Sequence, residues 1–577
     1  MTYEKAEEMA ESYDAVVIGA GHNGLVAANY LARAGRRVLV LEARDVVGGA
    51  CVTEELIPGS RWSSCAFIAG LLRPEIIEEL ELERFGLELY QGEALSFCLF
   101  PDGEHVFMWP DMDRTLREFE RLNKGDAKRF VEFGLRMQKF AGFVVPWLLE
   151  SPPARSEVLA AFEKAGEQEL FDEFTLLSVR DLLDRYFEDE RIKSFLTFFG
   201  MVSIWGGPST PGTSYVWGHH SWGEFQGRFG QFGMVRGGMG GISAALAAAA
   251  RHHGAEIRLG APVDTVVVER GRAVGVRLAS GELIEAGQVL SNADPQRSLL
   301  TLLPDKHLDP GLRTQIENLD NKGSMARIHL LIDELPQYLG FDSAEPGPQH
   351  HGHQLLGASR ELFEAAAVAQ RQGTFPEHYV IEAVIQSVTD PGLAPPGKHT
   401  MTLGVQQLSF ELAGTTWDEV KESWADAVLE DLFAYAPNLR GHVLDRVVIT
   451  PQDLEREYLI TGGNIFHGGM LLDQLFSSRP LDALKDYRTP VENYYLCGAG
   501  THPGGGVMGA SGHNAASAAL ADLGVARAAA RRRRGKRPHE NVLDRITATR
   551  AGRALSYQVA RQPLLRKITR AAARTRR

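Results

Sequence analysis

The stretch 14–42, which reads DAVVIGAGHNGLVAANYLARAGRRVLVLE, constrains the fold more than any other part of the sequence. Its apolar run at 15–18 is typical of a fully buried parallel strand. A helical spacing of apolar residues follows at 25–31, and a second apolar strand at 38–41 ends in Glu42. Between the first strand and the helix, the spacing G-x-G-x-x-G is formed by Gly19, Gly21 and Gly24. This order predicts a strand–turn–helix–strand unit that binds a dinucleotide.

Glycine is expected at each of these three positions for a different physical reason. Gly19 permits the tight turn, Gly21 lets the backbone approach a pyrophosphate, and Gly24 lets the helix and strand pack closely. The helix N-terminus adds free N–H groups and a positive dipole end. Glu42 can hold ribose hydroxyls, and its charge disfavours the 2′-phosphate of NADP. FAD and NAD both remain open on these residues alone.

Two further glycine-rich segments bear on the choice between FAD and NAD. Gly48 and Gly49 follow shortly after Glu42, in EARDVVGGACVTEE. Near the other end, residues 493–516 read NYYLCGAGTHPGGGVMGASGHNAA, a short apolar strand, a glycine cluster and an alanine-rich helix. Two glycine clusters far apart in sequence, each between a strand and a helix, predict one extended dinucleotide between them.

These segments resemble the phytoene desaturase/amine oxidase flavoprotein superfamily. The resemblance includes RGGMGG at 236–241 and LSNADPQ at 290–296, and it extends from about residue 13 to residue 526. Within the superfamily it is strongest to the pyridine nucleotide-disulfide oxidoreductase domain-containing protein 2 type, which is phytoene-dehydrogenase-related. Disulfide reductases carry two cysteines four residues apart beside the flavin. Cys51 and Cys65 are 14 residues apart, so we do not expect thiol–disulfide chemistry.

The resemblance implies FAD as the cofactor. It places the strand that begins at Val263 against the adenine, and His22 beside the phosphates. The residues expected to bind the cofactor are Gly19, Ala20, Gly21, His22, Asn23, Gly24, Glu42, Ala43, Arg44, Gly48, Gly49, Ala50, Gly238, Met239, Val263, Asn292, Gly498, Gly500, Gly506, Val507, Met508 and Ala510.

The expected fold class is α/β, with a two-dinucleotide-binding-fold (Rossmann-like) FAD domain and an inserted α+β substrate domain. We assign 13–105, 230–300 and 455–526 to a discontinuous FAD domain, 106–229 and 301–454 to the substrate domain, and 527–577 to a basic C-terminal tail. In related enzymes the substrate layer forms an apolar tunnel above the flavin. The same aromatic content would also be required by an ordinary hydrophobic core.

Two residues are candidates for a catalytic role. Arg327 lies where relatives show a basic residue near the flavin, and Lys322 is a poorer match. An arginine cannot act as a base but can orient a water or an anion; the alternative is a strand-end surface charge. His502 could shuttle a proton or only bond the loop backbone, and we favour the second interpretation.

Several histidines resemble metal ligands only by composition. They are the pair His219–His220 and the run His350, His351 and His353. No cysteine or acidic residue has the accompanying spacing, so we interpret them as loop histidines and expect no metal.

The net charge of −13 conceals an acidic body and a basic tail. From residue 527 onward there are 17 Lys/Arg against two acids, a balance of +15, which leaves −28 for the remainder. The acidic body argues against nucleic acid as a partner, and the tail favours an anionic membrane surface. The N-terminus has the wrong charge for a targeting segment. We expect a cytoplasmic protein, at the inner face of a membrane if peripheral, or in the mitochondrial matrix of a eukaryote.

The function that these features predict is an FAD-dependent oxidoreductase. It would remove hydride from a C–H bond of an apolar, isoprenoid or lipid-like small molecule, and an unknown electron acceptor would reoxidise the flavin. The alternatives are a flavin-dependent isomerase or hydratase, and a regulatory protein with structural FAD. Amine oxidation is less expected.

Overall fold

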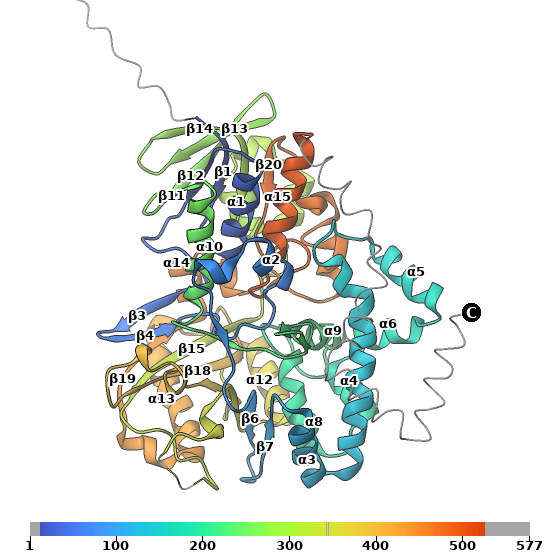
Figure 1. Ribbon diagram of the computed structural model, residues 1–577, viewed down its shortest axis with the longest axis vertical. Helices are drawn as coiled ribbons and strands as arrows, with labels where there is room; N and C mark the ends of the chain where they lie inside the picture. Colours follow the sequence, from blue (N-terminus) through green and yellow to red (C-terminus); the bar gives the residue numbers. More distant parts are fainter. Residues whose placement is uncertain (1–11, 342, 344, 525–577) are drawn as a thin grey trace, which may run out of the picture.

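The computed structural model describes residues 12–341, 343 and 345–524, which are arranged around two seven-stranded sheets (Figure 1). The first sheet lies at the top of the view with α1, α10 and α15, and the second lies at the bottom beside α13. Helices α3 to α9 form a separate layer along one side. The basic tail that we assigned to 527–577 lies outside the described residues.

The first sheet has the order β11-β2-β1-β14-β13-β12, with β20 also paired to β14. Its strands β11, β2, β1, β14 and β20 run parallel, and β12 and β13 form an antiparallel extension. The bounds are β1 Ser12–Ile18, β2 Val38–Leu41, β11 Glu256–Arg258, β12 Val263–Glu269, β13 Arg272–Leu278, β14 Leu283–Ser291 and β20 Tyr494–Leu496. The expected α/β fold class is confirmed.

Three helices pack together against this sheet: α1 (His22–Arg33), α10 (Gly240–His252) and α15 (Ala510–Asp522). Alanine and glycine are frequent in all three helices, and such small residues let helix backbones approach closely. The buried Asn29 on α1 joins two of them, because its Nδ2 donates to Leu246 O on α10 at 2.9 Å. The hairpin of β3 (Thr53–Ile57) and β4 (Ser60–Ser63) extends toward the second sheet.

The second sheet has the order β19-β15-β18-β17-β16-β6-β7. One face is apolar and packs on helix α13 (Trp417–Tyr435) through Trp417 and Trp424. The bounds are β6 Ser96–Leu99, β7 His105–Met108, β15 Ser324–Ile332, β16 His353–Leu356, β17 Ile381–Val384, β18 His399–Leu408 and β19 Val443–Ile449. Strand β6 lies within the range 13–105 that we assigned to the FAD domain, although it pairs in this sheet. The division into domains stays a prediction.

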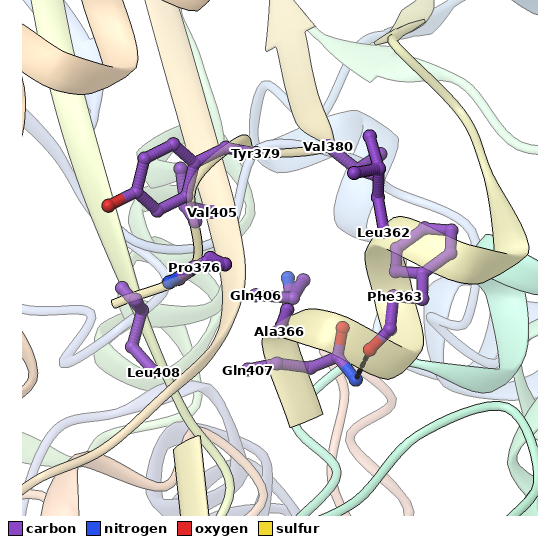
Figure 2. A pocket seen from close by; sticks show the side chains of 10 residues that line it. All are labelled: Leu362, Phe363, Ala366, Pro376, Tyr379, Val380, Val405, Gln406, Gln407 and Leu408. Atoms are coloured by element: carbon purple, nitrogen blue, oxygen red, sulfur yellow. Dashed lines mark hydrogen bonds between the residues drawn. The ribbon is translucent and has the colours of Figure 1, made fainter. Parts of the chain in front are cut away.

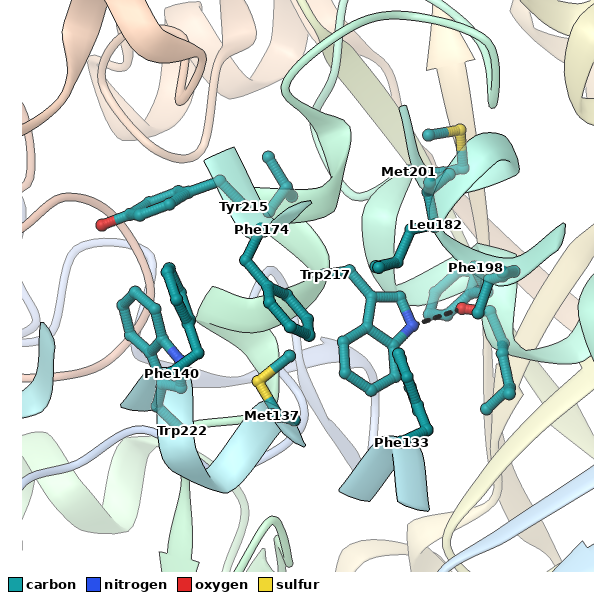
Figure 3. Packing of buried hydrophobic residues seen from close by; sticks show 14 of the residues in the cluster. Phe133, Met137, Phe140, Phe174, Leu182, Phe198, Met201, Tyr215, Trp217 and Trp222 are labelled. Carbon is teal, nitrogen blue, oxygen red and sulfur yellow. Dashed lines mark hydrogen bonds between the residues drawn. The ribbon is translucent and has the colours of Figure 1, made fainter. Parts of the chain in front are cut away.

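The helical layer is held together by aromatic packing (Figure 3). Phe133 and Phe140 of α4 face Phe174 of α6, and the Phe140 and Phe174 rings stack 4.9 Å apart. Trp217 of α9 packs on Phe133 at 4.7 Å. The helices are α3 Met112–Leu122, α4 Lys124–Val144, α5 Arg155–Ala165, α6 Gln168–Thr175, α7 Val179–Tyr186, α8 Glu190–Thr197 and α9 Thr213–His220. The labelled rings interdigitate as in an ordinary core.

The remaining regular elements are short or peripheral. They are α2 Pro74–Glu79, α11 Pro310–Glu317, α12 Arg360–Gln372, α14 Pro451–Tyr458, β5 Leu89–Tyr90, β8 Glu224–Phe225, β9 Arg228–Phe229 and β10 Met234–Val235. None of the helices in the described ranges is both long enough and apolar enough to cross a membrane.

Candidate cofactor and substrate site

In the glycine turn after β1, a side chain at Gly21 or Gly24 would meet neighbouring atoms. A Cβ on Gly24 would lie 2.2 Å from Gly19 O, and a Cβ on Gly21 would lie 2.5 Å from Asn292 Nδ2. Gly19 has φ +91°, which favours glycine. The Gly48 amide donates to Ala20 O at 2.9 Å and so holds the second glycine pair against the first turn.

Glu42 lies directly on this turn. The side chain is buried, with Oε2 accepting from Ala20 N at 2.7 Å and Oε1 from Arg44 N at 3.0 Å. Its own carbonyl accepts from Ala261 N at 2.8 Å, which brings the strand that starts at Val263 beside it. The sequence-predicted acid is therefore fixed between the glycine turn and the strand that we expect near the adenine.

Arg44 is also held at this end of the sheet. It forms an ion pair with Glu54 and lies over the Tyr458 ring, with Cζ 4.7 Å from the ring centre. Its buried Nη1 has no hydrogen-bond partner among the described residues. A buried donor of this kind requires an acceptor, which a cofactor oxygen can supply.

Asn292 connects the two halves of the cofactor site. It follows β14, donates its backbone N–H to Ile18 O at 2.8 Å, and packs its side chain over Gly19 and Gly21. A Cβ on Gly498 would lie 2.6 Å from Asn292 O. The first glycine turn and the C-terminal glycine loop therefore meet on this one residue.

The C-terminal loop continues into α15, whose N-terminus meets that of α1. A Cβ on Gly512 would lie 2.0 Å from Asn23 O, so glycine is required at this contact. The loop is also held from outside, because Arg73 N donates to Met508 O at 3.2 Å. Gly500, Gly506, Val507 and Ala510 lie in this same loop and helix start, as the sequence predicted.

The segment at 238–240 packs on the loop that follows the second glycine pair. Met239 N donates to Ser63 Oγ at 3.0 Å, and Gly240 N donates to Thr53 Oγ1 at 2.9 Å. A Cβ on Gly238 would lie 2.2 Å from Thr53 Oγ1. The chain contacts described above thus connect the predicted cofactor segments at one end of the first sheet, including Ala43, Gly49 and Ala50, which lie within those segments.

Three histidines lie at the C-terminal loop, of which His219 and His502 are buried and His22 is partly buried. Burial lowers the pKa of His22 to about 4, of His502 to about 4 and of His219 to about 3, so each imidazole is neutral at neutral pH. His502 Nε2 contacts Trp147 O at 3.0 Å. It therefore bonds backbone, as we favoured, but the backbone of the helical layer rather than that of its own loop.

Sequence reasoning missed Arg479, which fixes the C-terminal loop. Its guanidinium is 1% exposed and donates to the carbonyls of Phe466, Gly469 and Ala499. Burial lowers its pKa to about 10. The stretch SSRP around it carries no motif, so no signal in the sequence distinguishes this arginine from a surface residue.

Arg327 is only 4% exposed and lies within β15, which excludes the interpretation as a strand-end surface charge. Its Nη1 is 3.2 Å from Glu382 Oε1, and its Cζ lies 4.1 Å from the centre of the Phe67 ring. Lys322, the poorer match, is exposed and lies over Trp205. Glu382 was not identified from the sequence.

The histidines that resemble metal ligands are not loop residues in most cases, so that interpretation needs correction. His219 and His220 end helix α9, and His353 begins strand β16 and is 2% exposed. Within the described ranges, no group of three or more His, Cys, Asp or Glu side chains could hold a metal ion.

Comparisons with known proteins agree with this geometry. A family model described as flavin containing amine oxidoreductase matches residues 24–520. The chain belongs to this family. The mouse (Mus musculus) pyridine nucleotide-disulfide oxidoreductase domain-containing protein 2 is 38% identical over 90% of this chain and 96% of its own length. The expected superfamily and type are confirmed.

More distant relatives extend the family comparison. A phytoene desaturase (neurosporene-forming) from Cereibacter sphaeroides is 27% identical over 88% of this chain and 94% of its own length. The crystal structure of an oxidoreductase from Methanosarcina mazei has a TM-score of 0.57 at 18% identity, covering 88% of this chain and 99% of that one. The second comparison shows the fold alone.

Membership in this flavin family makes the protein an FAD-dependent oxidoreductase, and the residues present fit FAD. The glycine turn and C-terminal loop leave backbone where side chains would collide. Arg44 Nη1 and His22 Nε2 are buried polar atoms with no hydrogen-bond partner among the described residues. Gly21, Gly24 and Glu42 would hold the nucleotide part, and the loop from Gly498 to Ala510 would hold the rest.

Two small cavities border the second sheet. One, of about 10 Å³, lies between α12 and the end of β18 and is lined by Phe363, Tyr379 and Gln407 (Figure 2). The other, also about 10 Å³, is lined by Trp62 and Phe67 near Arg327. Each has room for no more than one water molecule.

Proposed function

We propose that this oxidoreductase dehydrogenates an apolar substrate by removing hydride from a C–H bond. The observation that carries the proposal is the packing of the C-terminal glycine loop. Met508 and Ala510 of that loop lie in one continuous apolar cluster with the aromatic layer of α4, α6 and α9. A substrate beside this loop would contact apolar and aromatic side chains and be shielded from water.

The residues around the loop orient the substrate and offer an acceptor for the proton that leaves the neighbouring C–H bond when the double bond forms. When bound, FAD supplies the hydride-accepting chemistry. The imidazoles of His22, His219 and His502 are neutral at neutral pH. The buried Nδ1 atoms of His219 and His502 have no hydrogen-bond partner among the described residues and can accept that proton. Arg327 cannot serve as a base. This set of groups favours a reaction whose difficult step is carried by the cofactor, and the phytoene desaturase among the relatives is named for such a dehydrogenation.

The test is an anaerobic titration of the purified yellow protein with apolar compounds. We expect an isoprenoid or lipid-like compound to bleach the visible flavin band, with formation of one new double bond per flavin. Flavin that dithionite reduces but no apolar compound reduces would overturn the proposal in favour of structural FAD. Bleaching by amines alone would instead indicate amine oxidation, and product with an unchanged redox state would indicate an isomerase.

A flavin-free variant provides the control. In Gly21→Val the new side chain points at Asn292 Nδ2, a side chain that can move, so the protein can fold while the turn is blocked. We expect colourless protein that gives no product. Full flavin content in this variant would contradict the assignment of the glycine turn.

We also propose that residues 527–577 attach the protein to anionic lipid surfaces. The proposal is supported by their net charge of +15, against −28 for the rest of the chain. Each basic residue near an anionic leaflet contributes about 1 kcal/mol of binding free energy. Full-length protein should co-sediment with anionic vesicles at low salt, whereas protein ending at Leu523 should not. Equal binding of both, or binding that survives molar salt, would contradict the proposal.

A further inference from the structure

The second sheet has one buried face that is polar. On its apolar face, Ile328, Leu330 and Leu403 pack toward α13. Residues of opposite parity in the same strands point to the other face, because successive side chains of a strand alternate. That face carries a set of polar residues, each at most 6% exposed: Arg327, His329, His353, Glu382, Thr402 and Gln406. Burying so many polar groups is costly unless something satisfies them.

A glycine allows two of these side chains to meet. Arg327 of β15 and Glu382 of β17 are both opposite Gly404 of the intervening strand β18. A Cβ on Gly404 would lie 1.8 Å from Arg327 Nη1, so the ion pair crosses the strand where there is no side chain. Burial alone would raise the pKa of Glu382, but the Arg327 guanidinium holds it at about 2.

Several buried polar atoms in this row have no hydrogen-bond partner among the described residues. Glu382 accepts a hydrogen bond from Gln406. Arg327 Nε and both ring nitrogens of His353 have no hydrogen-bond partner among the described residues. His353 Nε2 is 3.8 Å from Glu382 Oε2, which is too long for a hydrogen bond. Buried polar atoms without partners require an explanation.

The row lies beside the cofactor loop and between aromatic rings. The His353 ring lies 6.5 Å from the ring of Phe199, whose carbonyl contacts His220 Nδ1 at 3.0 Å. The adjacent His219 contacts Gly505 O of the glycine loop through Nε2 at 2.9 Å. The Phe198 ring lies 4.8 Å from the His353 ring, and Phe67 covers Arg327. Aromatic side chains and two histidines thus connect these polar groups with the glycine loop, beside which we propose that the apolar substrate lies.

We infer that Arg327 and His353 bind an uncharged oxygen, a carbonyl or hydroxyl group, at the end of an otherwise apolar substrate. This inference rests on the proposed function, because it names the substrate class of that same site. The substrate is then an oxygenated lipid or isoprenoid rather than a pure hydrocarbon. Since Arg327 and Glu382 already balance each other, a carboxylate or an ammonium group would add an uncompensated buried charge.

The experiment measures binding rather than turnover. Equilibrium dialysis of the FAD-loaded protein would compare 2-tridecanone with tridecane, dodecanoate and dodecylamine. We expect the ketone to bind at least tenfold more tightly than each of the other three, although tridecane is the most hydrophobic. Equal or tighter binding of the alkane, tightest binding of the carboxylate or the amine, or no measurable binding of the ketone would overturn the inference.

Three variants test the named residues. His353→Phe removes both ring nitrogens, keeps the Arg327–Glu382 pair, and should reduce the ketone-to-alkane preference by about tenfold. The double change Arg327→Met with Glu382→Met removes the pair together, so no charge is left alone, and should abolish the preference. The matched control is His350→Phe, a buried histidine whose Nδ1 and Nε2 contact Gly347 N and Pro336 O. It should leave the preference unchanged.

The outcomes separate this inference from the proposed function. Selective binding of the ketone without flavin bleaching by any apolar compound would support the oxygen site and contradict dehydrogenation. Bleaching by a hydrocarbon, together with no preference for the ketone, would support dehydrogenation and contradict the oxygen site. If His353→Phe and His350→Phe change the preference equally, the assignment to His353 is wrong.

Discussion

The cofactor end of the first sheet and the polar face of the second sheet both depend on a glycine, in different ways. At Gly24 a side chain would meet the backbone of the same turn, 2.2 Å from Gly19 O. At Gly404 it would meet the tip of Arg327, a side chain from a neighbouring strand. The first glycine shapes a site within one short segment, and the second leaves room for a site that three strands build together.

The largest effect is expected at Gly24. The Gly19 carbonyl cannot move without opening the turn, so Gly24→Val should cost on the order of 5 kcal/mol or more of stability. We expect insoluble or colourless protein, measured by soluble yield and flavin content. The control is Gly134→Ala on α4, where a Cβ meets nothing within 4 Å. That variant should be stabilised by up to about 1 kcal/mol. Soluble, fully yellow Gly24→Val protein would show that the turn tolerates a side chain.

At Gly404 the effect should be smaller, because a side chain can yield where a backbone cannot. Gly404→Ala should separate Arg327 from Glu382 and leave two buried charges unpaired, at a cost of about 3–5 kcal/mol. Denaturant unfolding measures the loss, and the folded fraction should keep its flavin. Stability within 1 kcal/mol of the wild type, or flavin loss from folded protein, would remove the distinction between the two glycines.

The third prediction concerns the contribution of Glu42 to FAD binding at the cofactor end of the first sheet. Charge-assisted hydrogen bonds are worth about 1.5–3 kcal/mol each, so Glu42→Ala should raise the FAD dissociation constant at least about tenfold. The variant also deprives Ala20 N–H and Arg44 N–H of their acceptor. Glu42→Gln retains one acceptor oxygen and should lose less affinity. Unchanged FAD affinity in the alanine variant would mean that Glu42 only closes the turn.

The smallest effect concerns His219, which contacts the C-terminal glycine loop. Burial lowers its pKa to about 3, below the usual 6.5, so the unfolded chain binds a proton that the folded protein does not. Stability is therefore lost as the pH falls below 6.5, by about 1.4 kcal/mol from this residue at pH 5.5. Between pH 7.5 and pH 5.5 the free energy of unfolding should decrease by about 1.4 kcal/mol less in His219→Gln than in the wild type. An unchanged pH slope would contradict a neutral buried His219.

The difference between the two regions also explains what the sequence could reveal. The glycine turn, Glu42 and the second glycine pair lie within one local stretch, so their spacing alone predicted a dinucleotide site. The C-terminal loop was predicted because it repeats the same strand–glycine–helix order. The FAD assignment and the α/β class are accordingly confirmed.

The polar face was not predicted as a unit, since it arises from strand register. Arg327, His353 and Glu382 come from three strands, and nothing in the sequence states which residues are opposite Gly404. Arg327 was named only through the family resemblance, and His353 was interpreted as a loop histidine. Glu382 and Arg479 carried no signal because a charged residue with ordinary neighbours indicates a surface position.

The order of strands in the first sheet has a consequence for how the protein is made. Strand β1 pairs with β14, so one edge of β1 stays without its partner until residue 291 has been synthesised. At 5–20 residues per second, the delay after residue 18 is roughly 15–55 s. Protease sensitivity of ribosome-bound chains, compared before and after β14 emerges, would measure the exposure. During that interval the growing chain exposes an edge of β1 that is buried in the finished sheet. The complete FAD site can form only after α15 has left the ribosome.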